Sequence, residues 1–274
     1  MRSFYACLKK ERMELVRTGR LTILLIVYTL FGIMNPAIAK LTPWLMKTLS
    51  GSLEATGLIV TEITVDALTS WEQFYKNIPM ALIILVLILC GTFTAEYQKG
   101  TLIPILTRGL SRYKIVASKE LTLISLWTLC YWLCYLITYI YTAWFWDNGI
   151  ASNLLFAGTA YWLFGIWVLS LLTLFSTLTK TGANVLLGTG AAVLAAYLLG
   201  LLPPFKNYVP TKLMSAGALL KAYSQLPDAA GSGPRPSGSI VSSADYLPSV
   251  CVALALTALS TAAAMIIFNR RRTQ

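Results

Sequence analysis

"FTAEYQKGTLIPILTRGLSRYKIVASKEL" (residues 93–121) follows one long apolar run of the chain and leads into the next. It holds five basic residues, a Gly-Thr pair, a proline and a turn sequence, Gly-Leu-Ser, flanked by arginines. Cationic segments between two apolar runs are typical of loops that join membrane spans on the cytoplasmic side. The fold therefore depends on how many runs of this kind the chain contains.

The composition is that of an integral membrane protein. Of the 274 residues, 57% are hydrophobic and only 12% are charged, whereas soluble domains carry roughly 25% charged residues. A helix needs about 20 apolar residues to cross the hydrocarbon layer. Six runs qualify: 21–39, 78–96, 121–145, 154–178, 183–202 and 247–268. The sequence predicts an all-α integral membrane protein whose single transmembrane domain, 1–274, has six transmembrane helices.

Basic residues predict the orientation of these helices. The segments 1–20, 97–120, 179–182 and 269–274 contain 15 of the 22 lysines and arginines. Because cytoplasmic loops are enriched in basic residues, both termini are expected in the cytoplasm. The net charge of +11 is then explained by membrane anchoring, and no nucleic-acid partner is expected.

The segments outside the spans suggest further helices. Residues 1–20 mix basic and apolar side chains and predict an interfacial amphipathic helix, although a positively charged flank that only fixes topology is the alternative. Ser70-Trp71-Glu72-Gln73 resembles a capping box, which predicts a short helix before the second span. Residues 203–246 form a predicted extracellular loop, in which 210–223 have apolar residues at helical spacing.

Several kinds of chemistry are not indicated. The sequence has no histidine, and four of its five cysteines lie inside predicted spans, so neither a metal site nor a disulfide framework is expected. Glu96, Glu120 and Asp147 lie at span ends, whereas ion-coupled transporters place carboxylates deep in the membrane. We predict no catalytic residues, no metal and no cofactor in this chain.

One aromatic series lies on a single face of the third predicted span. Trp127, Tyr131, Tyr135 and Tyr139 are four residues apart, and residues at this spacing are neighbours on a helix surface. They predict either a packing seam between helices, or a substrate path or dimer seam.

The opening segment itself predicts a pair of short helices under the membrane. Gly100 is suited to end one helix, Thr101 to cap the next, and Gly109-Leu110-Ser111 to turn the chain. A simple cationic loop would account for the basic residues but not for this ordered pattern.

These residues resemble the cytoplasmic loop of ABC transporter permeases of the second permease type, which have the type V exporter fold. The likeness includes six spans and a helical leader with Glu11 and Glu14, and thus covers most of the chain. It rests on the loop motif Glu96-x3-Gly100-Thr101, followed by Leu106-x-Arg108 and Ser111-Arg112-x5-Ser118-Lys119.

The resemblance implies a membrane subunit that works with separate ABC ATPase subunits and a second permease subunit, identical or related, in the bacterial cytoplasmic membrane. Ten residues would couple the ATPase to the spans through the helix pair in 97–120: Glu96, Gly100, Thr101, Arg108, Ser111, Arg112, Lys114 and Lys119 in the loop, and Glu11 and Glu14 in the leader. ATP and magnesium would be bound by the ATPase, since the sequence lacks the Gly-x4-Gly-Lys-Ser/Thr phosphate-binding pattern. This chain is therefore not expected to be an enzyme.

The expected function is export of an amphipathic or hydrophobic substrate, such as a peptide, lipid or drug, with antimicrobial peptides favoured. The alternatives are an ATPase-independent channel, a secondary transporter, or an immunity or scaffold protein.

Overall fold

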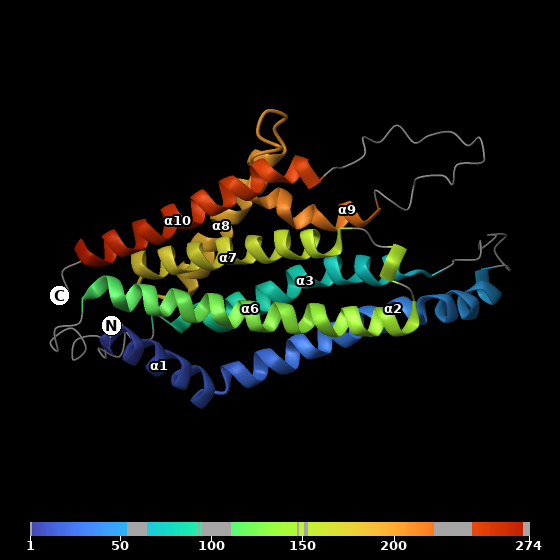
Figure 1. The fold of residues 1–274 in the computed structure, drawn as a ribbon, viewed down its shortest axis with the longest axis horizontal. Coiled ribbons are helices and arrows are strands. Elements are labelled where there is room, and N and C mark those ends of the chain that lie inside the picture. The colour runs from blue at the N-terminus through green and yellow to red at the C-terminus, as the bar shows by residue number, and fades with distance from the viewer. Residues whose placement is uncertain are drawn as a thin grey trace.

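The computed structural model describes residues 2–53, 65–92, 94, 111–146, 148–150, 153–221 and 243–270. In this part of the chain all regular secondary structure is helical (Figure 1). The longer helices are α1 (Arg2–Arg17), α2 (Arg20–Leu53), α3 (Ala67–Leu89), α6 (Arg112–Phe145), α7 (Leu154–Leu178), α8 (Gly182–Gly200) and α10 (Leu247–Arg270). The short ones are η2 (Asn148–Ile150), η3 (Pro210–Gly217), α9 (Ala218–Lys221) and η4 (Ser243–Tyr246).

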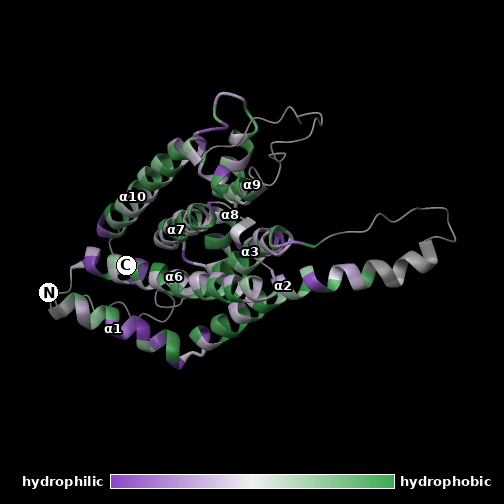
Figure 2. Ribbon diagram, turned by 45° about the vertical axis from the view of Figure 1, so that its right-hand side comes forward, coloured by the Kyte–Doolittle hydropathy of each residue, from purple (hydrophilic) through white to green (hydrophobic). Residues whose placement is uncertain are grey.

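Six helices are long and apolar enough to cross a membrane, as the sequence predicts. The candidate spans are Arg20–Leu45, Ala67–Leu89, Arg112–Phe145, Leu154–Leu178, Gly182–Gly200 and Ser243–Arg270. Hydrophobic positions dominate these helices, and α1 mixes hydrophilic and hydrophobic positions (Figure 2). The prediction of six helices that are long and apolar enough to cross a membrane is therefore confirmed.

Several helices extend beyond the apolar runs that predicted them. Both α2 and α6 have 34 residues, or about 51 Å at 1.5 Å per residue, which exceeds the ~30 Å hydrocarbon layer. Helix α3 begins at Ala67, well before the predicted boundary at residue 78. Its first turns are amphipathic, with a buried side at Ser70, Trp71 and Phe74, and apolar content alone does not detect such turns.

The predicted capping box at Ser70 is wrong. Asp66 precedes the first residue of α3, and Ser70 lies inside the helix. The Ser70 hydroxyl instead lies 2.8 Å from that of Thr142 on α6. The Ser70 side chain therefore contacts another helix, α6, and does not cap the start of its own helix.

Polar contacts join the spans inside the bundle. Tyr28 on α2 donates to the carbonyl of Ala81 on α3 at 3.0 Å, and Asn77 on α3 donates to Asn35 on α2 at 2.9 Å. Ser260 on α10 donates to Ser170 on α7 at 2.7 Å. In lipid the apolar surface alone gives little preference for a neighbouring helix, so such bonds and close packing hold helices together.

Residues 201–221, which follow α8, form a cap on the bundle. Helix η3 lies against α7, α8 and α10, and buries Leu213 and Ala216. The Lys212 ammonium donates to the carbonyl of Asp245 at 2.7 Å and to the side chain of Asn207 at 2.9 Å. These bonds tie the cap to the start of α10.

Candidate functional site

The start of α1 lies at one end of the bundle, beside the start of α6 (Figure 1). The end of α10 reaches the same place and packs against α6. We call this group the helix junction: α1, residues 111–123 of α6 and residues 260–270 of α10. Residues 111–121, the C-terminal part of the cationic segment, belong to this junction.

Local sequence places α1 at the junction. After α1 the Thr18 hydroxyl donates to the Glu14 carbonyl at 2.7 Å, which satisfies one of the last acceptors of the helix. Gly19 then adopts a left-handed conformation, with φ of 71°, which glycine adopts at little cost. The chain turns there, and α2 begins at Arg20.

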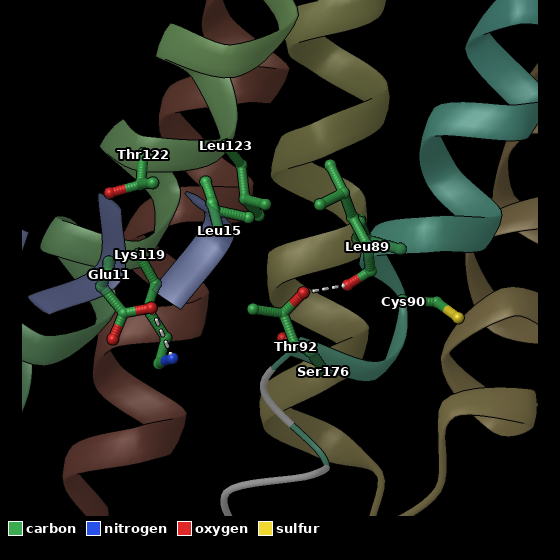
Figure 3. A pocket seen from close by; sticks show the side chains of 10 residues that line it. Glu11, Leu15, Leu89, Cys90, Thr92, Lys119, Thr122, Leu123 and Ser176 are labelled. Atoms are coloured by element: carbon green, nitrogen blue, oxygen red, sulfur yellow. Dashed lines mark hydrogen bonds and ion pairs between the residues drawn. The ribbon is translucent and has the colours of Figure 1, made fainter. Parts of the chain in front are cut away.

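A buried ion pair joins α1 to α6. The Lys119 ammonium lies 2.9 Å from a carboxylate oxygen of Glu11, and the two side chains are only 2% and 6% exposed. Figure 3 shows these two side chains pointing toward each other from α6 and α1. Lys10 lies 3.5 Å from the other Glu11 oxygen. Removing one member of a buried pair typically costs about 3–5 kcal/mol, because the other charge stays buried without compensation.

Helix α6 is held to α10 by three kinds of contact. The Thr261 hydroxyl donates to a Glu120 carboxylate oxygen at 2.6 Å, and the Arg112 guanidinium donates to the Phe268 carbonyl at 3.5 Å. Val116, Ala264 and Phe268 form a small buried apolar cluster between them. Three helices that are distant in sequence are thereby fixed as one unit.

A small cavity lies beside the ion pair. Its volume is about 20 Å³, which is enough for one water molecule. Glu11, Lys119, Thr92 and Ser176 supply polar lining from α1, α6, the residues after α3, and α7. Arg20 donates to the Thr92 hydroxyl at 3.3 Å on the same side of the bundle. The junction therefore combines charged and hydroxyl groups at one end of an otherwise apolar bundle.

The structure brings together part of the predicted coupling set. Glu11 and Lys119 are paired, and Arg112 contacts α10. Ser111 precedes α6 without a side-chain cap bond, and Lys114 lies 5.8 Å from the Tyr113 ring centre. Glu14 is half-buried on α1. Four further members of the set, Glu96, Gly100, Thr101 and Arg108, lie outside the described residues, as does most of the predicted helix pair.

Three of the four seam aromatics lie in the core between α3, α6 and α7. Trp127 donates to the Trp162 carbonyl at 3.0 Å, and Tyr131 donates to the Gly158 carbonyl at 2.7 Å. Tyr135 stacks beside Tyr131 and is 5% exposed. This arrangement matches a packing seam within one chain, whereas Tyr139 reaches the surface.

Sequence reasoning missed the role of Glu120. It noted this carboxylate at a span end but assigned it no contact, while the structure buries it against Thr261. Its second oxygen is buried without a described hydrogen-bond partner. The sequence does contain a signal for a buried polar contact here, because two charged residues, Lys119 and Glu120, directly precede the apolar run 121–145.

A larger cavity opens among α3, α7, α8 and η3. Its volume is about 440 Å³, within the ~300–1,000 Å³ range of small-molecule pockets. Its lining is almost entirely apolar: Pro79, Leu82, Ile83, Val86, Leu87, Tyr161, Phe164, Val168, Leu186, Thr189, Gly190, Val193, Leu194, Tyr197, Thr211 and Met214.

The six apolar helices define the class: a helical, multi-pass membrane protein. Among the described residues no group of three or more cysteine, aspartate or glutamate side chains is placed to hold a metal ion. No protein-family model, curated protein or solved structure matches the chain.

Proposed function

We propose that this chain is the membrane-spanning permease subunit of an ATP-driven exporter, located in the bacterial cytoplasmic membrane. It would work with a second permease subunit and with separate ABC ATPase subunits that bind ATP and magnesium. The proposal starts from the sequence resemblance of 96–119 and the leader to such permeases.

The observation that carries the proposal is the buried ion pair between Glu11 and Lys119. An ATPase can drive a permease only if its motion reaches the spans through a stiff connection, because packed helices move as units. The ion pair fixes α1 to Lys119 in the first turns of α6, which are also the C-terminal part of the cationic segment 93–121. Force applied to that segment would therefore move α1 and α6 together.

The large apolar cavity supports a hydrophobic or amphipathic cargo. Its lining from α3, α7 and α8 offers contact area but almost no charge, which suits acyl chains, drugs or apolar peptide side chains. Antimicrobial peptides are amphipathic, and we favour them as cargo.

Purification of the tagged chain from its native membrane tests the proposal. Mass spectrometry should find a co-purifying protein that contains the Gly-x4-Gly-Lys-Ser/Thr pattern this chain lacks. A properly folded chain that purifies with no such protein would contradict the assignment and favour an immunity or scaffold role.

Charge reversal then tests the coupling segment. Arg108→Glu with Arg112→Glu should reduce ATPase association and stimulation at least tenfold while membrane insertion is unchanged. The matched control is Lys180→Glu with Lys206→Glu, which reverses two exposed basic positions outside the helix junction and should retain the ATPase. Equal losses in the two variants would show that only net charge matters.

A further inference from the structure

We infer that the outward face of α1 binds anionic phospholipid headgroups of the inner leaflet. This inference is independent of the ATPase partner, because it concerns a surface of α1 that faces away from the rest of the chain.

The face is defined by five exposed residues of α1. Tyr5, Lys9, Arg12, Met13 and Val16 are all exposed, and at ~100° per residue they fall within an arc of about 100° on the helix. Glu11 and Leu15 lie on the opposite side and are buried. Helix α1 therefore has one side buried against the bundle and an opposite, exposed side, the outward face.

The outward face combines apolar surface with positive charge. Tyr5, Met13 and Val16 are 63%, 50% and 57% exposed, which would be unfavourable for a helix surrounded by water. Lys9 and Arg12 lie among them, and Arg17 lies about 40° beyond the arc. The acidic residues of α1 are Glu11, which is buried, and Glu14, which is half-buried on the other side.

This combination complements an anionic membrane surface. Apolar side chains of an interfacial helix enter the boundary between headgroups and acyl chains, while Lys and Arg stems extend so that their charges reach phosphates. Each basic residue near an anionic surface contributes about fivefold in affinity. An uncharged lipid would satisfy the apolar side chains but leave the two central cations without partners.

Position supports the same occupant. Helix α1 ends at Arg17, and the membrane-crossing helix α2 begins at Arg20. Met13 and Val16 therefore lie within two turns of the point where the chain enters the bilayer. Because Glu11 and Lys119 lock the other side of α1 to α6, lipid bound on the outward face would stabilise the whole helix junction.

Lipid titration of the full chain in neutral detergent tests the inference. Native mass spectrometry and thermal unfolding would compare phosphatidylglycerol with phosphatidylcholine of identical acyl chains. We expect the native chain to prefer phosphatidylglycerol at least fivefold, and Lys9→Gln with Arg12→Gln to reduce that preference below twofold. Since both residues are exposed, the lipid-free melting temperature should not change.

Matched variants separate this face from general charge effects. Lys180→Gln with Arg270→Gln removes two exposed cations elsewhere and should keep the preference for phosphatidylglycerol. Met13→Ser with Val16→Ser should weaken the binding of both lipids equally.

The inference is overturned if the Lys9/Arg12 variant keeps the preference for phosphatidylglycerol, or if the control variant loses as much of that preference. If free glycerol 3-phosphate displaced phosphatidylglycerol at a concentration equal to that of the lipid, the inference would be overturned in favour of a simple phosphate site. Loss of ATPase binding with unchanged lipid preference would assign the face to a protein.

Discussion

Lys119 and Glu11 lie 2.9 Å apart at the helix junction, and both side chains are almost completely buried. Their attraction offsets the cost of burying each charge, so neither can be removed cheaply. Lys119→Met or Glu11→Leu alone should lower the free energy of unfolding by about 3–5 kcal/mol. The double variant Glu11→Leu with Lys119→Met should lose much less than the sum, and detergent thermal unfolding would measure both.

The exposed pair of Lys76 and Glu72 provides the control for that cycle. These side chains are 3.9 Å apart and 66% and 33% exposed, so Lys76→Met should change stability by less than about 1 kcal/mol. Additive losses for Glu11 and Lys119 would mean that the two charges are not energetically coupled, and the rigid link between α1 and α6 would lose its basis.

Thr261 provides a second test at the level of one residue. Its hydroxyl donates to Glu120 at 2.6 Å, and Thr261→Val would leave that buried carboxylate without its described donor. The expected loss is about 1–3 kcal/mol. Thr257→Val is the matched control, since the hydrogen bond described for that hydroxyl stays within its own helix, to the Ala253 carbonyl. Equal effects on the melting temperature would contradict a role for Glu120 in holding α10.

At the scale of elements, the approach of α6 to α7 depends on glycine. A Cβ at Gly165 would overlap the indole ring of Trp127, whereas a Cβ at Gly190 would meet nothing within 4 Å. Gly165→Ala should therefore destabilise the bundle by about 1–3 kcal/mol, because overpacking shifts a ring that is itself buried. Gly190→Ala should be close to neutral. If thermal unfolding gave the reverse order, α6 and α7 would not pack as described.

The same elements show what sequence can predict. Long apolar runs gave the six spans because the membrane demands continuous apolar helix. Helix ends were less predictable: α3 extends back to Ala67 because its first turns bury Trp71 and Phe74 against neighbouring helices. The partners of Ser70 and Glu11 lie 72 and 108 residues away. Such pairs follow from tertiary packing and leave no local pattern.

At the scale of the whole molecule, both proposals require the junction to face the cytoplasm. The chain places 15 of its 22 basic residues in segments assigned to that side. The loop at Lys180 belongs to the junction end, since Gly182 lies beside Cys90 and Thr94, and neighbouring Thr92 bonds Arg20. Lys206 lies at the other end, next to Asn207, whose carbonyl accepts from Ser249 near the start of α10.

Cysteine labelling of intact cells tests this arrangement. Cys7, Cys90 and Cys251 would be replaced by alanine, while the buried Cys130 and Cys134 stay in place. A membrane-impermeant maleimide should label Lys206→Cys from outside, and Lys180→Cys only after the membrane is opened. The reverse result would place the ion pair and the basic face of α1 outside the cell, where neither an ATP-bound partner nor the anionic inner leaflet can reach them. Both proposals would then fail together, while the six-helix fold would stand.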